Sequence, residues 1–188
     1  CMTFDSAIEN LLPADDPERV YYEEVKRTFG SDEITVIAVF APDVFVPATI
    51  KKVAQLSEQL AAIDGVREVL SLSTAKGVET DEYGAVRIGT LMDAVPRTRA
   101  DALVLRDKIL ANPVYAGHIA GPDSRVTAIV VLFEALSEQA FLERDIDGQI
   151  RTLVQQFDGG REEFVMTGTQ TLKVQGAQLM ERDLIRFL

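Results

Sequence analysis

The side chains that could carry out chemistry in this chain are few and scattered. A zinc site needs several His or Cys ligands, and the single histidine, His118, has no cysteine near it in the sequence. A catalytic triad needs a histidine base, so any such triad would have to use His118. We therefore predict that His118 is a loop or surface residue, that the chain holds no cofactor or metal, and that it is not an enzyme.

Adjacent acidic residues are the second candidate for catalysis, because glycoside hydrolysis uses two carboxylates. Such pairs occur at Asp15-Asp16, Glu23-Glu24 and Glu162-Glu163. Neighbouring residues in a strand or helix point in different directions, so these carboxylates do not face one another across a substrate. The chain also lacks Trp, and nothing indicates an aromatic cleft. A hydrolase that uses acidic residues is therefore the least favoured of the functions we consider.

A short apolar loop is the most suggestive candidate for binding. Val44, Phe45 and Val46 lie between polar turns and just before Pro47. Exposed apolar residues mark contacts with a partner or an apolar substrate, so these three are the candidate contact residues. The alternative is that the loop packs against the following helix, as a hydrophobic staple does, and the pattern favours this alternative.

Charge and length narrow the range of partners. The net charge of -11 argues against nucleic acid and anionic membrane surfaces as partners, because proteins bind both through Lys and Arg side chains. With 188 residues the chain can bury a core without a disulfide, and it fits one domain. No apolar run reaches the roughly 18 residues that a membrane-spanning helix needs. We therefore expect the chain to be soluble. Because it does not begin with Met, we also expect it to be a piece of a larger or processed protein.

A strand-helix-strand unit spans residues 34–73. The first run, Ile34–Phe40, is apolar at both sets of alternate positions, which predicts a strand that is covered on both faces. The second run, 67–73, alternates with polar residues, which predicts a half-exposed edge strand. Between the two runs, helical spacing relates Ile50, Val53, Leu56, Leu60 and Ile63.

A second unit of the same order spans residues 126–168. It has an apolar strand at Val126–Phe133, a long helix that Ser137 can cap, and an alternating strand near residue 164. The segment 64–68, Asp-Gly-Val-Arg-Glu, is echoed by 158–162, Asp-Gly-Gly-Arg-Glu. The order of elements and this echo together predict a duplication.

The predicted fold class is α+β, with a ferredoxin-like core of duplicated β-α-β units in which the first strands are central and the last strands lie at the edges. The core comprises residues 31–73 and 126–169. An inserted subdomain at 74–125 contains a short strand at Val86–Met92 and a helix with a Thr98–Asp101 capping box. Terminal helices at 15–29 and 170–188 complete a single domain, 1–188. Helices cover one face of such a sheet, so the second face needs the N-terminal helix, the insertion or a neighbouring domain.

The order of these elements resembles the first periplasmic loop of resistance-nodulation-division transporters, in the branch of the mycobacterial large membrane proteins and lipid exporters. The matching segments are 12–17, 29–33, 65–72 and 167–169, which are caps, turns and strand patterns. Members of the family often have Pro after the glycine that Gly168 matches, whereas this chain has Thr169.

The resemblance implies a porter-like extracytoplasmic domain of a proton-driven exporter of hydrophobic or lipid-like substrates, located at the inner membrane. Its partners would be the second periplasmic domain and the transmembrane helices of the same protein. The resemblance also allows a homo-oligomer. The proton-relay residues would lie in those helices, outside this chain. The apolar end near Phe187 would continue into the membrane. The alternative is a free-standing ferredoxin-like module that binds a small molecule or regulates another protein.

Overall fold

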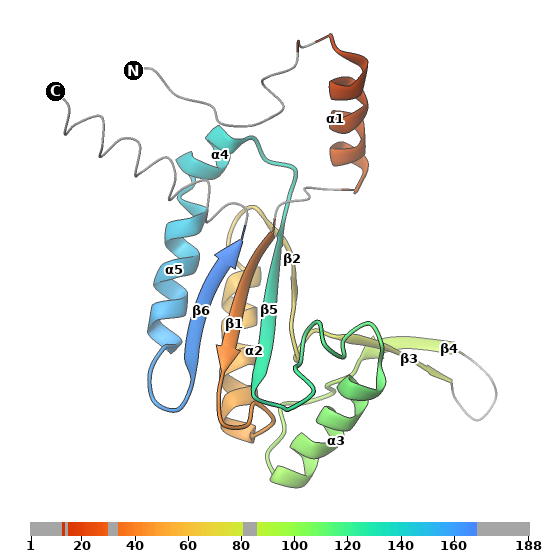
Figure 1. The fold of residues 1–188 in the computed structure, drawn as a ribbon, viewed down its shortest axis with the longest axis vertical. Coiled ribbons are helices and arrows are strands. Elements are labelled where there is room, and N and C mark those ends of the chain that lie inside the picture. Colours follow the sequence, from red (N-terminus) through yellow and green to blue (C-terminus); the bar gives the residue numbers. More distant parts are fainter. Residues whose placement is uncertain (1–12, 14, 30–33, 81–85, 169–188) are drawn as a thin grey trace, which may run out of the picture.

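The protein combines helices with antiparallel sheets, so the predicted α+β class is confirmed (Figure 1). The computed structural model describes residues 13, 15–29, 34–80 and 86–168. The predicted closing helix at 170–188 lies outside these residues. Within the described ranges, no helix is long and apolar enough to cross a membrane.

Four antiparallel strands form the main sheet in the order β2-β5-β1-β6. They are β1 (Ile34–Phe40), β2 (Val66–Leu70), β5 (Val126–Phe133) and β6 (Glu163–Gly168). The two strands that are apolar at all positions but one, β1 and β5, are central, and the two alternating strands are at the edges. The position of each strand is therefore as the sequence predicts, because a central strand exposes less of its length than an edge strand does.

One face of the main sheet is covered by two helices, α2 (Pro47–Ala61) and α5 (Ile146–Phe157), which also contact each other. In Figure 1 α2 lies behind the strands and α5 lies beside β6. We call this the covered face. The side chains that β1 and β5 direct to it are at most 1% exposed: Thr35, Ile37, Val39, Thr127, Ile129, Val131 and Phe133.

The opposite face of the sheet, which we call the open face, is equally apolar but only half buried. Phe40 is 44% exposed and Val165 is 42% exposed. Among the described elements, the helices that contact the sheet pack on the covered face, so the predicted cover of the second face stays a prediction. The partly buried residues that β1 and β5 direct to the open face are Ile34, Val36, Ala38, Val126, Ala128, Val130 and Leu132.

Two helices differ from the prediction. The first, α1 (Pro17–Phe29), begins where Asp16 caps it, with the Glu18 amide donating to Asp16 Oδ1 at 2.9 Å. A spacing of four relates Tyr21, Val25 and Phe29 in the sequence and predicts a packing face, but Tyr21 is 67% exposed, so the prediction is wrong at this residue. The predicted long second-unit helix is broken at Asp145, which adopts the left-handed conformation, and a short helix α4 (Glu138–Glu143) precedes α5.

The insertion forms a hairpin and a helix next to one end of the sheet. The hairpin pairs β3 (Lys76–Thr80), which the sequence did not predict, with β4 (Val86–Thr90). The helix α3 (Arg99–Ala111) begins with both hydrogen bonds of the predicted Thr98–Asp101 capping box. In Figure 1 the hairpin extends away from the sheet, whereas α3 lies near the end of α2.

Candidate functional site

The predicted contact loop lies between β1 and α2. Val44 and Phe45 are fully buried, and Val46 is half buried. Their burial agrees with the packing interpretation of the loop. A role of Val44, Phe45 and Val46 in contacting a partner or substrate stays a prediction, and only Val46 has surface that a partner could reach in this structure.

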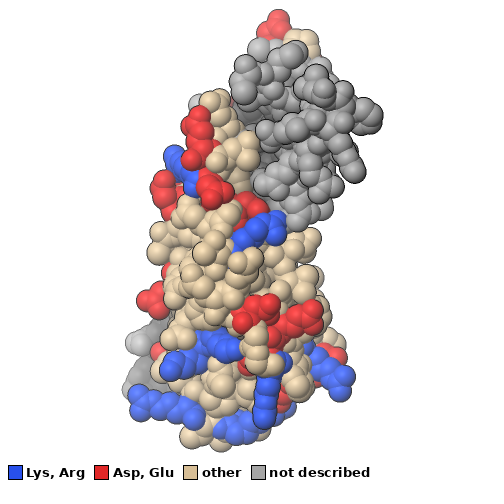
Figure 2. Space-filling model, turned by 90° about the vertical axis from the view of Figure 1, so that its left-hand side faces the viewer, with Lys and Arg blue, Asp and Glu red and all other residues tan. Residues whose placement is uncertain are grey.

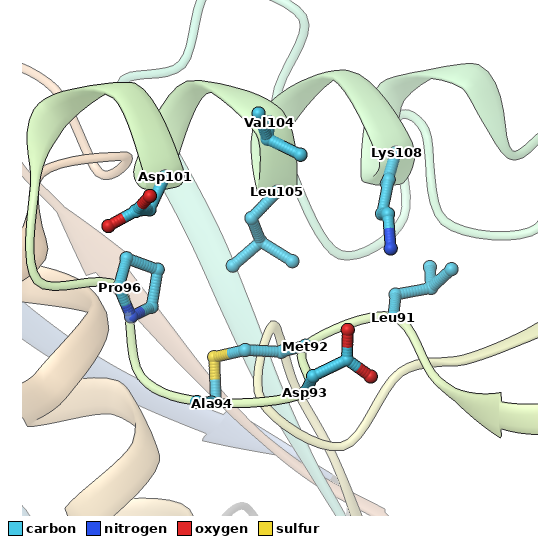
Figure 3. Close-up of a pocket in the computed structure, with 9 residues that line it drawn as sticks. All are labelled: Leu91, Met92, Asp93, Ala94, Pro96, Asp101, Val104, Leu105 and Lys108. Atoms are coloured by element: carbon cyan, nitrogen blue, oxygen red, sulfur yellow. The ribbon is translucent and has the colours of Figure 1, made fainter.

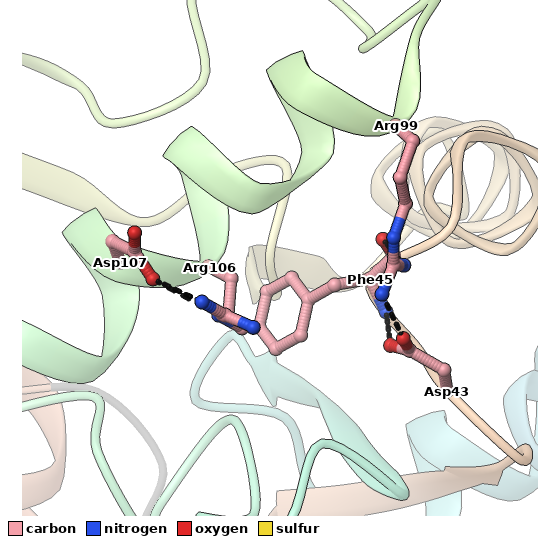
Figure 4. Close-up of polar contacts among 5 residues, drawn as sticks. All are labelled: Asp43, Phe45, Arg99, Arg106 and Asp107. Carbon is pink, nitrogen blue, oxygen red and sulfur yellow. Dashed lines mark hydrogen bonds and ion pairs between the residues drawn. The ribbon is translucent and has the colours of Figure 1, made fainter.

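The loop is held in place by a polar cluster that joins it to α3 (Figure 4). Arg99 donates from Nη1 to the Phe45 carbonyl at 2.6 Å and pairs with the Asp43 carboxylate. The Phe45 amide donates to Asp43 Oδ1 at 2.8 Å. In Figure 4 the Phe45 ring points toward Arg106 of α3. The insertion therefore fixes the loop that follows the first strand.

The charge of Asp43 belongs to this cluster. Burial raises the pKa of the carboxyl group, but the hydrogen bonds from Arg99 and from the Phe45 amide, together with the charges of Arg99 and Arg106, outweigh it. The pKa of Asp43 is therefore below its ordinary value. The carboxylate is a structural partner of α3, since its oxygens are already used within the chain.

A shallow cavity lies between α3 and the segment that precedes it (Figure 3). Val104 and Leu105 lie on one side, and Met92 and Pro96 lie on the other. Its volume is about 150 Å³. Ligand sites for small organic molecules usually measure roughly 300–1,000 Å³, so this cavity holds at most a small group.

A second polar cluster joins α2 to the loop before β6. Thr49 Oγ1 donates to Glu162 Oε1 at 2.7 Å, and Lys52 Nζ donates to Glu162 Oε2 at 2.8 Å. Burial raises the pKa of Glu162, but the hydrogen bonds from Lys52 and Thr49 outweigh it and lower the pKa below 4.5. Glu162 thus ties two elements together, and it is not a free catalytic acid.

The other candidates for catalysis do not assemble. His118 is exposed, as predicted. Glu162 contacts α2, whereas Glu163 is exposed and pairs with Phe40 on the open face, so this acid pair points apart as expected. The part of the chain described by the structure contains no group of three or more His, Cys, Asp or Glu that could hold a metal ion.

The open face is the remaining candidate, and acidic residues lie on its edge strands. The strand positions that point to it include Glu68 opposite Leu132 and Glu163 opposite Phe40. Charged side chains elsewhere are unevenly spread. In Figure 2 most visible Lys and Arg lie in the lower part of the molecule, and a band of uncharged side chains lies above them.

Sequence reasoning missed the partners of several residues. Arg99 carried no signal, because its role depends on Asp43 and Phe45, which are more than 50 positions away. Glu162 was considered only as part of an acid pair. At Gly168 the glycine itself was a sign of close backbone contact. An added Cβ would lie 2.4 Å from the Ile34 carbonyl oxygen, so only glycine fits beside β1.

Comparisons with known proteins do not assign the chain to a family. No protein-family model matches the chain, and a search of curated proteins finds no match either. The resemblance to resistance-nodulation-division transporters therefore stays a prediction based on the order of elements.

Proposed function

We propose that this chain is a porter-like extracytoplasmic domain of a proton-driven exporter of the resistance-nodulation-division superfamily. The observation that carries the proposal is the open apolar face. A sheet buries its apolar faces against other layers, and among the described residues the helices α2 and α5 supply one such layer. In such an exporter, a second extracytoplasmic domain or a hydrophobic substrate would supply the other.

The strand order supports a ferredoxin-like duplication. Ile37 of β1 pairs with Ile129 of β5. Two residues before Ile37 and Ile129 lie Thr35 and Thr127, and two residues after them lie Val39 and Val131. Each of these residues is buried on the covered face. An approximate twofold axis between Ile37 and Ile129 thus relates these two strands, which supports the proposed duplication of the two units.

Contacts at the ends of the helices repeat with the same symmetry. Lys52, in the first turns of α2, binds Glu162 of the second unit's loop. Arg144, just before α5, binds Asp64 of the first unit's loop with 2.9 Å between Nη1 and Oδ2. Each unit therefore holds the helix-to-strand loop of the other, as expected when both descend from one β-α-β segment.

The places where the chain enters and leaves the core also suit a loop between two membrane helices. Thr35 at the beginning of β1 pairs with Gly168 at the end of β6. The segments before and after the core therefore start from neighbouring strands at one edge of the domain. Two consecutive transmembrane helices would need this closeness of their connecting domain.

The alternative of a free-standing small-molecule module would need a pocket of adequate size. The cavity beside α3 has about 150 Å³, which is below the usual range. The exporter proposal is preferred because it accounts for the open face of the described structure.

Transport by the full-length protein tests the proposal. Cells with Val130→Asp should accumulate the exported hydrophobic molecule as a deletion strain does, while Val104→Asp, at a 58% exposed position of α3, should export normally. Both variants must reach the membrane in equal amounts. The coding sequence on both sides of this chain should encode apolar runs of about 20 residues. Ordinary polar sequence on both sides, or normal export by Val130→Asp, would remove the proposal.

A further inference from the structure

We draw no further inference here: the strongest candidate, the exposed apolar patch where Val78 and Ile88 pair across the β3–β4 hairpin, carries none because nothing in the described part of the structure shows what covers it.

Discussion

On the central strands β1 and β5, the two faces of the main sheet are both largely apolar but have different surroundings. Strand β5 directs Val131 to the covered face, where it is fully buried, and Val130 to the open face, where it is partly exposed. Helices α2 and α5 account for the difference, because both pack on one side. The covered face holds the domain together, whereas the open face is the one that we propose contacts another molecule. Substitutions on the two faces should therefore affect different properties.

Phe45 gives the largest expected effect, because its side chain is fully buried although it lies in a loop. Replacing Phe45 with Ala should lower the free energy of unfolding by about 3–5 kcal/mol, through lost burial and a new cavity. Urea denaturation measures the change, with Val46→Ala as the half-buried neighbour that should lose far less. A change below 1 kcal/mol in Phe45→Ala would mean that this loop is not part of the core.

Two adjacent valines compare the faces directly. Val131→Ala should cost about 2–3 kcal/mol of unfolding free energy, because it removes two buried methyl groups and leaves a cavity. Val130→Ala removes the same atoms from a half-exposed surface and should cost less than about 1 kcal/mol. Equal losses in urea denaturation would show that the open face is covered within the chain itself.

Two adjacent glutamates extend the comparison to charge. Glu162→Gln should lower the free energy of unfolding by about 1–2 kcal/mol, because the charge-assisted hydrogen bonds from Lys52 and Thr49 are weakened. Glu163→Gln, one residue later on the open face, should change it by less than about 0.5 kcal/mol. Thermal denaturation of both variants at neutral pH measures the difference, and a reversed order would contradict the assigned contacts.

Acid should reduce the effect of Glu162. Its pKa is lower in the folded protein than the ordinary 4.5, so its contribution is complete above that pH and disappears as the pH falls through the lowered value. The stability difference between the unmodified chain and Glu162→Gln should thus be constant from pH 7 to 5 and shrink below pH 4.5. A difference that grows on acidification would contradict this sign.

The sequence predicted the strands that depend on local pattern. The bounds of β1 and β5 and the start of α3 follow from apolar runs and from the Thr98–Asp101 capping box. The central and edge positions follow from the contrast between largely apolar and alternating strands. These features are predictable because neighbouring residues determine them.

Features that depend on distant residues were not predictable. The loop at Phe45 had two interpretations, and its burial depends on Arg99 in the insertion. Strand β3 has Gly and charged residues and becomes a strand through pairing with β4. The break at Asp145 has no glycine to mark its left-handed conformation. The pattern of β1 indicates an apolar open face, but an apolar pattern does not say which molecule covers it.

Cysteine labelling of Val165 tests most directly whether another molecule covers the open face. Val165 is 42% exposed in this chain, and Val104 on α3 is 58% exposed. In full-length protein in its membrane, with Cys1 replaced by Ser, we expect a water-soluble maleimide to label Val104→Cys quickly and Val165→Cys only after denaturation. Equal labelling of the two native variants would contradict a covered open face.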